Sequence, residues 1–506
     1  MTYRHLFSLA VALGIAPATL TAQGAFGSAL AVSGREVYVG QPENTYGPGV
    51  VYVFRPDAKG VWRVATKITR SGASNGDGFG SALAIDGNTL LVGDAKADSE
   101  SGVVYVFTRD ASGAWRETGT IKPRERHPAD AFGAGVVLSG DRAYVSTGIR
   151  GFGSMVFTRR SGTVFVFRNT GGTWAAETTL TPGDTVSNPT FGNAVAASGS
   201  RLMVGSFRAD SGNGAVYVFN RDAASGWKLD SKLSPPGPIT GRNSGFGSSL
   251  VLRGDSAFIG AVNDRGAGAV WLFARDSTSG RWSPVTRTLP FDAGFGTRYG
   301  VSLAEVGNEL WVGADGANSF QGGVFRVTRD STGFPSATKL SAEKSTGSDR
   351  FGARIAATAS LIAIAASNED YGEGGVTLYS RRPPPNGTWA AAGHLVGDVS
   401  TLPALTGANR ECTGGKVSIF DCNQVDLMSF LPVAAIGGKR GVQLSDVWGY
   451  NDPQSGHEIV IVGRVDGTAF VDISDASHPV YLGELPKTAG SPGSFWREIK
   501  TYKHYA

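Results

Sequence analysis

The sequence has few residues that carry local catalytic or metal-binding chemistry. Its six histidines lie far apart, and His457-Glu458 has no second histidine four residues further on, as a helical zinc motif would require. It also lacks a G-x-S-x-G turn and a glycine-rich phosphate loop followed by lysine. These absences exclude sites that a single short segment supplies, but not a site assembled from distant loops.

Strong charge of one sign and long apolar runs are missing as well. The formal net charge is +4 over 506 residues, and the lysines and arginines are dispersed. We therefore expect no nucleic-acid partner, because such a partner requires a basic patch or stripe. After residue 22 no run approaches the roughly 18 apolar residues of a membrane-spanning helix. The nearest, Ile355–Ala366, fills two strand positions, so we expect no transmembrane segment.

Glycine, in contrast, is abundant, with 72 residues, and a pattern of some fifty residues occurs seven times. Each copy opens on an aromatic residue followed by glycine, and successive openings are 52 to 59 residues apart. The seven pairs are Phe26-Gly27, Phe79-Gly80, Phe132-Gly133, Phe191-Gly192, Phe246-Gly247, Tyr299-Gly300 and Phe351-Gly352. A segment such as G-V-V-Y-V-F and a later aromatic residue return in step with these pairs.

Residues 78–123 show how one copy is built. The copy holds four apolar runs that are rich in Val, Tyr, Phe and Leu and are too short for stable helices. They are Ser81–Ile85, Thr89–Gly93, Val103–Thr108 and Trp115–Ile121. Asp-Gly-Asn joins the first two runs as a tight hairpin, and a turn containing Asp and Gly joins the last two. The copy is therefore predicted to be a four-stranded antiparallel meander.

Seven such copies predict an all-β fold, a seven-bladed β-propeller of four-stranded antiparallel blades. Because one sheet cannot bury both of its faces alone, neighbouring blades must stack. The aromatic residue that opens each fourth strand is expected to lie in the core between blades and to bury a large area. These residues are Trp62, Trp115, Trp174, Trp227, Trp282, Phe334 and Trp389.

The repeated pattern resembles the FG-GAP family of β-propeller repeats, and in particular its secreted bacterial form. That form reads F-G-x-S-V-A, then V-G-A, then G-A-Y-V-F and finally G-x-W. The resemblance covers residues 24–397. It implies a seven-bladed propeller that is extracellular and that serves in binding rather than in catalysis.

Many FG-GAP repeats hold Ca²⁺ in a D-x-D-x-D-G loop between their first two strands, because this ion takes about six to eight oxygen ligands. In this sequence that connection is a short hairpin in all seven copies. The remaining Ca²⁺ candidates are Asp94 and Asp98, in the longer loop after the second strand. Other copies carry acids in this loop at Asp210, Asp264, Asp315, Glu369 and Asp370. We interpret them as solvated turn carboxylates, and we expect no cofactor and little contribution from Ca²⁺.

Two further segments raise the possibility of a binding function. Arg253–Ser256 spells the integrin-binding tetrapeptide R-G-D-S, but it occupies the hairpin position of Asp86–Thr89, so ordinary turn chemistry explains it. The third copy is longer than the second, with extra residues around Arg150–Met155. We interpret these residues as a solvated insertion on one face of the propeller, where loops often carry binding sites.

Residues 1–22 have the pattern of a secretory signal peptide. Arg4 supplies the positive start, Leu6–Ile15 the apolar core, and small residues follow. Cleavage after Ala18 and cleavage after Ala22 both fit, and a buried N-terminal strand is the alternative. We therefore expect a secreted, extracellular protein.

The repeats end at residue 397, residues 398–410 are predicted to be a linker, and residues 411–506 follow a different pattern. Cys412 and Cys422 are the only cysteines, and behind a signal peptide they are expected to form a disulfide, with two free thiols as the alternative. The segments S-D-V-W-G-Y and G-T-A-F-V-D-I-S-D resemble the opening of the choice-of-anchor B domain and its LVIVD repeat. The resemblance implies a partial second propeller-like β domain. We expect the sequence to be incomplete and the missing part to attach the protein to the cell envelope.

These features favour a secreted or envelope-anchored binding or scaffold protein that presents propeller-face loops to an extracellular protein or a glycan. The alternatives are an extracellular hydrolase or lyase with a site in the central channel, and a passive surface spacer. Carboxylates, histidine and arginine along the channel would favour the enzyme, whereas apolar, serine and glycine residues would favour binding.

Overall fold

The computed structural model describes residues 25–42, 47–148, 162–183, 188, 190–237, 243–292, 294–330, 333–342, 347–382, 387–398, 402–418, 420–488, 491, 498–503 and 505. The predicted signal peptide and the insertion around Arg150–Met155 lie outside these residues. None of the helices in the described part of the chain has the length and apolar character that a membrane crossing requires.

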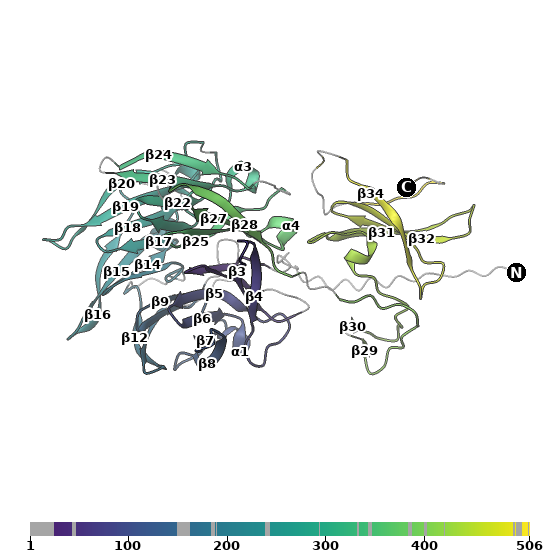
Figure 1. Cartoon of the computed structure of the whole chain (residues 1–506), viewed down its shortest axis with the longest axis horizontal. Coiled ribbons are helices and arrows are strands. Elements are labelled where there is room, and N and C mark those ends of the chain that lie inside the picture. Colours follow the sequence, from purple (N-terminus) through teal and green to yellow (C-terminus); the bar gives the residue numbers. More distant parts are fainter. Residues whose placement is uncertain are drawn as a thin grey trace.

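The regular structure of the described residues is dominated by antiparallel strands (Figure 1). Between residues 29 and 395 they form seven four-stranded sheets, each from four consecutive strands in chain order. The sheets contain β1 (Ala29–Ser33), β2 (Glu36–Gln41), β3 (Val50–Pro56) and β4 (Trp62–Ile68); β5 (Phe79–Asp86), β6 (Thr89–Asp94), β7 (Val103–Arg109) and β8 (Trp115–Ile121); β9 (Gly135–Ser139), β10 (Arg142–Ser146), β11 (Val164–Thr170) and β12 (Thr173–Leu180); β13 (Val195–Ser198), β14 (Arg201–Ser206), β15 (Ala215–Asp222) and β16 (Gly226–Leu233); β17 (Phe246–Arg253), β18 (Ser256–Ala261), β19 (Ala269–Arg275) and β20 (Trp282–Thr288); β21 (Leu303–Val306), β22 (Glu309–Gly313), β23 (Val324–Asp330) and β24 (Gly333–Leu340); and β25 (Phe351–Ala357), β26 (Leu361–Ala366), β27 (Gly375–Arg381) and β28 (Trp389–Leu395).

Short helical turns follow the second strand in five of these sheets. They are α1 (Ala97–Glu100), α2 (Ala209–Gly212), η1 (Asp264–Gly266), α3 (Ala317–Phe320) and α4 (Glu369–Gly372). A further short turn, η2 (Val433–Ile436), lies in the C-terminal region.

The strands predicted for residues 78–123 are confirmed to within two residues at each end. The hairpin between β5 and β6 pairs Asp86 with Thr89, and Gly87 takes a positive φ of 58°. In the turn between β7 and β8, the Asp110 carboxylate accepts the N–H groups of Ser112 and Ala114 at 2.9 and 3.1 Å. The turn residues therefore act as their chemistry predicts, by bonding the backbone of their own turn.

Neighbouring sheets meet through the first strand of each. Strand β1 contacts β5, β5 contacts β9, and the succession continues through β13, β17 and β21 to β25, which contacts β1. At five of these contacts the aromatic residue of the opening pair donates its N–H to a carbonyl just before the third strand of the preceding sheet. The donors and acceptors are Phe132 to Ser101, Phe246 to Asn213, Tyr299 to Ala267, Phe351 to Gln321, and Phe26 to Glu373. The last of these bonds, 3.1 Å long, links the first sheet to the seventh.

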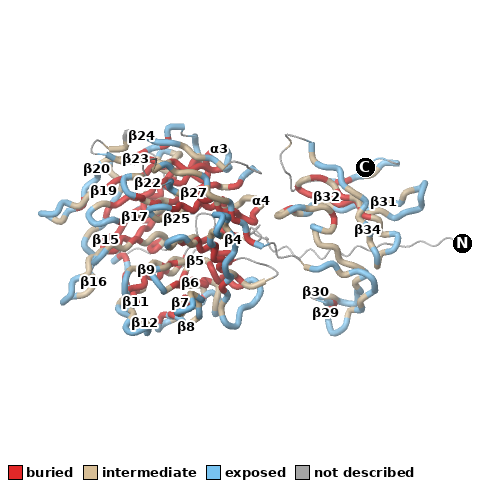
Figure 2. Tube along the Cα trace, in the orientation of Figure 1, coloured by how far each residue is buried: buried red, intermediate tan, exposed pale blue. Residues whose placement is uncertain are grey.

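The core is divided into seven apolar clusters, each built from two neighbouring sheets. Figure 2 shows this burial along the inner strands of the repeat region. The aromatic residue of every opening pair is fully buried, and Phe79, for example, packs edge-on against Tyr105 and Phe107 at 5.6 and 5.9 Å. Each aromatic residue that opens a fourth strand belongs to a different cluster. Trp282 is buried there and the other six are half-buried.

The C-terminal region contains one further four-stranded antiparallel sheet among its described residues. Its strands are β31 (Leu444–Asn451), β32 (Glu458–Arg464), β33 (Gly467–Asp472) and β34 (Val480–Pro486), and a small hairpin is formed by β29 (Lys416–Val417) and β30 (Phe420–Asp421). Cys412 and Cys422 form the expected disulfide, with their Cα atoms 5.9 Å apart. Ile436 and Leu431 pack on one face of the sheet.

Two residues of the predicted linker 398–410 pair with the C-terminal region. Leu405 exchanges backbone hydrogen bonds with Phe430, and Arg410 does so with Leu427, so these residues already belong to the C-terminal β region. That region contacts the seventh sheet near α4, where Arg440 lies 2.8 Å from Asp370 and also donates to the Gly374 carbonyl. The composition of residues 398–410 gave no sign of this pairing, because the partner residues are not adjacent in sequence.

Replacing Phe79 with alanine is expected to lower the free energy of unfolding by about 3–5 kcal/mol, since a fully buried ring between two sheets would be lost. Urea unfolding followed by circular dichroism measures this change. Val61→Ala is the matched control, because Val61 is exposed in a turn and its loss should change stability by less than about 0.5 kcal/mol. Equal effects of the two substitutions would contradict the role assigned to the opening aromatic residues.

Candidate functional site

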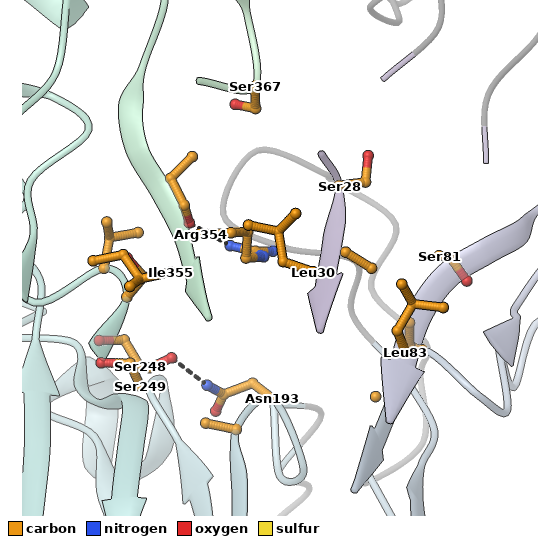
Figure 3. Close-up of a pocket in the computed structure, with 18 of the residues that line it drawn as sticks. Ser28, Leu30, Ser81, Leu83, Asn193, Ser248, Ser249, Arg354, Ile355 and Ser367 are labelled. Atoms are coloured by element: carbon orange, nitrogen blue, oxygen red, sulfur yellow. Dashed lines mark hydrogen bonds between the residues drawn. The ribbon is translucent and has the colours of Figure 1, made fainter. Parts of the chain in front are cut away.

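A cavity of about 610 Å³ lies where the first strands of the seven sheets converge. All seven sheets contribute residues to its wall, and we call it the central cavity. Figure 3 shows Ser28 and Leu30 of the first sheet, Ser81 and Leu83 of the second, and Arg354 of the seventh around it. Its volume lies within the range of about 300–1,000 Å³ that is usual for small-molecule sites.

The repeated sequence pattern determines most of the residue types in the wall of the central cavity. The second residue after the glycine of each opening pair is small in six copies, because seven strands crowd together here. These residues are Ala29, Ala82, Gly135, Ala194, Ser249 and Ser302. The residue after each of them is aliphatic in all seven copies, giving Leu30, Leu83, Val136, Val195, Leu250, Leu303 and Ile355. We call the second set the aliphatic ring.

Several polar side chains of the wall already bond within the protein. The hydroxyl groups of Ser249 and Ser302 donate to the carbonyl oxygens of Gly300 and Gly352 at 2.6 and 2.7 Å. The Asn193 amide donates to the carbonyl oxygens of Gly247 and Ser248. Figure 3 draws the bond to Ser248 as a dashed line. These groups stabilise the contacts between sheets.

Three arginines and one aspartate break the pattern of the repeat. Arg354 takes the place that is small in the other six copies, and Arg298 and Arg350 precede the aromatic residue, where the other copies have Ala25, Gly78, Ala131, Thr190 and Gly245. Asp315 is buried and its carboxylate lies 3.1 Å from Arg298 and 3.7 Å from Arg350. We call these four residues the arginine cluster. The signal for it was present in the sequence, as departures from the repeat at fixed positions.

Burial dominates the electrostatics of the arginine cluster. It raises the pKa of the Asp315 carboxyl above its usual value, and the neighbouring arginines offset only part of this effect. Burial likewise lowers the pKa of the Arg298 and Arg354 guanidinium groups. The Arg354 side chain is nevertheless exposed, because it borders the central cavity. The cluster therefore places positive charge at the wall of the central cavity.

The two Ca²⁺ candidates lie outside this cluster and each has partners within the protein. The Asp98 carboxylate lies 3.2 Å from Lys122 and 2.6 Å from Arg126, and these contacts lower its pKa. Asp94 is fully buried, and its Oδ1 accepts the N–H groups of Gly78, Lys96 and Ala97. The interpretation as solvated turn carboxylates is therefore wrong for Asp94 and also for the buried Asp315. Among the described residues, no group of three or more potential ligands could hold a metal ion.

The R-G-D-S segment forms the hairpin between β17 and β18, as predicted, with Arg253 paired to Ser256. The Asp255 carboxylate lies 2.6 Å from Arg201 of the preceding sheet, and Arg253 donates to the Gly307 carbonyl of the following one. Both charged side chains of the segment therefore contribute to contacts between neighbouring sheets.

The FG-GAP repeat family matches residues 62–107 and 174–219. Each match begins at the last strand of one sheet and ends in the third strand of the next, so the repeat in sequence spans two sheets. No curated protein matches the chain significantly. The FG-GAP repeats and the disulfide fit an extracellular protein.

Three solved structures align with most of this chain at low sequence identity. A protein from Lactobacillus plantarum is 16% identical over 69% of this chain and 95% of its own, with a TM-score of 0.45. A periplasmic gluconolactonase from Pseudomonas aeruginosa is 17% identical over 71% and 96%, with a TM-score of 0.47. Hydrazine synthase from Kuenenia stuttgartiensis is 13% identical over 76% and 99%, with a TM-score of 0.44. With its recurring sheets and its FG-GAP repeats, the chain is a β-propeller repeat protein.

Ca²⁺ is expected to leave the stability of the protein unchanged, because the carboxylates that could bind it already have protein partners. Thermal unfolding of the whole chain should give the same midpoint with a chelator and with millimolar CaCl₂. A saturable rise of the midpoint with Ca²⁺, which linkage requires for an occupied site, would contradict this expectation. MgCl₂ at the same ionic strength is the control for general salt effects.

Proposed function

We propose that the protein is a secreted or envelope-anchored binding or scaffold protein, which presents the loops of one propeller face to an extracellular protein or a glycan. In this proposal, residues 1–22 are a signal peptide and residues 24–397 form a closed ring of seven blades. Residues 411–506 are then the start of a choice-of-anchor B domain with LVIVD-like repeats. The seven successive sheets and the hydrogen bond from Phe26 to Glu373 support the closed ring.

One observation carries the choice of binding over catalysis, namely the composition of the central cavity. Its wall is made mostly of small and aliphatic residues, and Asp315 is the one carboxylate among the described residues that line it. Acid–base catalysis by a hydrolase or lyase usually needs two titratable groups placed on either side of the reacting bond. This composition supports a binding protein.

The enzyme alternative rests on the arginine cluster. A buried carboxyl with a raised pKa beside two arginines is a recognised feature of catalytic sites, although structural ion pairs shift pKa values in the same way. The enzyme alternative predicts that the ligand is cleaved and that cleavage needs Asp315. The binding proposal predicts that the ligand is recovered unchanged and that binding does not need Asp315.

A glycan array and a panel of extracellular proteins, probed with the whole chain, should identify at least one saturable ligand. Mass spectrometry of the recovered ligand should show it unchanged, and Asp315→Asn should bind it as the wild type does, because this carboxylate is buried and already contacts Arg298 and Arg350. Recovery of a cleaved ligand, together with loss of cleavage in Asp315→Asn, would replace the binding proposal by the enzyme alternative. Absence of any ligand would favour a passive spacer.

The division into two domains predicts the order of proteolysis. The C-terminal sheet has a small core on one face, and Leu444, Val447 and Leu485 are exposed. Limited trypsin or thermolysin digestion under oxidising conditions should therefore cut the chain after residue 398 well before it cuts within the repeats. Mass spectrometry of the fragments measures this order, and equal survival of the two parts would show that the C-terminal region is as stable as the propeller.

A further inference from the structure

The charge along the central cavity is unbalanced among the residues that the structure describes. Lys96, Arg298, Arg350 and Arg354 line the cavity, and Asp315 is the single carboxylate there. The contacts of Asp315 are with Arg298 and Arg350. Arg354 donates from Nη1 to the carbonyl of its neighbour Ala353 at 3.0 Å and forms no ion pair with any described residue. A guanidinium group stays protonated in proteins, and the one carboxylate that attracts Arg354 electrostatically, Asp315, is shared with Arg298 and Arg350.

The propeller does not need arginine at this position for packing. Three other copies of the repeat have alanine at the position of Arg354, and the remaining ones have glycine or serine. Arg354 is exposed to the cavity, and three guanidinium groups face a single carboxylate there, so the local potential is positive. The position of Arg354 therefore favours an anion that comes from outside the chain.

The surroundings of Arg354 restrict what kind of anion fits. The aliphatic ring borders the same cavity, and Figure 3 shows the guanidinium group of Arg354 directed toward Leu30 of this ring. The side chains of Ser249, Ser302 and Asn193 already donate to backbone carbonyls, and the buried Ser248 hydroxyl is the one serine of the described lining that is known to lack a partner. A ligand would thus meet arginine at one end and apolar surface along its body, and a planar guanidinium group binds a carboxylate through two parallel hydrogen bonds.

We propose that the central cavity binds a small organic acid, whose carboxylate pairs with Arg354 and Arg350 and whose apolar body lies against the aliphatic ring. The cavity of about 610 Å³ is large enough for a monocyclic acid with several ordered waters. The cavity wall includes residues of the loops that follow the second strands, such as Asp315. The two proposals concern different ligands, a small acid here and a protein or glycan above, so either can fail without the other.

The test measures thermal unfolding of the whole chain with sodium benzoate, sodium acetate or sodium galacturonate, at constant ionic strength. Benzamide is the neutral counterpart of benzoate. We expect benzoate to raise the unfolding midpoint in a saturable way and benzamide to have no such effect. The effect of benzoate should exceed those of acetate, which has little apolar body, and galacturonate, which has a polar one.

Arg354→Ala is the decisive variant, because alanine occupies this position in other copies and the fold should tolerate it. We expect the variant to need at least tenfold more benzoate for the same shift, and Arg354→Lys to retain part of the response. Arg116→Gln, on the exposed face of strand β8, is the matched control and should respond as the wild type does. The proposal is overturned if benzoate gives no shift, if benzamide acts equally, or if Arg354→Ala responds like the wild type.

Discussion

Close approach between two backbones determines how the sheets of this propeller meet. At Gly93 a Cβ atom would lie 2.1 Å from the carbonyl oxygen of Gly133 in the next sheet, so no side chain fits there. The same contact recurs between Gly40 and Gly80 and between Gly205 and Gly247. Because the backbones touch, the aromatic residue before each second glycine is placed between the sheets. The buried ring and the cluster around it depend on that contact.

This constraint explains which parts of the fold could be predicted from the sequence. Strands and hairpins such as β5 and β6 depend on local alternation and on turn residues, and these signals repeat seven times. The innermost strand and the contact between β25 and β1 depend on residues that are hundreds of positions apart. Nothing in the local pattern specifies them. Their prediction requires the packing itself.

The candidate site shows the same division between local and distant information. The wall of the central cavity follows the repeat, so its small and aliphatic positions could be predicted once the copies were aligned. Arg298, Asp315 and Arg350 come together only in the folded chain. Asp94 and Asp315 were misinterpreted because an acidic loop residue is usually solvated, whereas here neighbouring sheets cover both side chains. Departures from a repeat are therefore more informative about function than the repeat itself.

Left-handed turns follow several of the second strands, and strand or helix propensity does not predict them. Asp98 and Asp210 both have a positive φ, near 50°, and aspartate and asparagine tolerate this conformation better than other side chains. Their carboxylates pair with cations at or beyond the end of the fourth strand, as in the contact of Asp210 with Lys232 at 2.8 Å. Exposed pairs of this kind contribute little energy each.

The chain enters and leaves the repeat region at the same contact between sheets. Phe26 bonds to Glu373 of the seventh sheet, and Asp398, at the exit, bonds through its N–H to Tyr52 and pairs with Lys67 of the first sheet. A mechanical pull on the C-terminal region would therefore load this one contact first, while the other sheets carry no tension. That contact consists of a few hydrogen bonds and an apolar cluster near Phe26. The rest of the propeller would keep its shape around the central cavity.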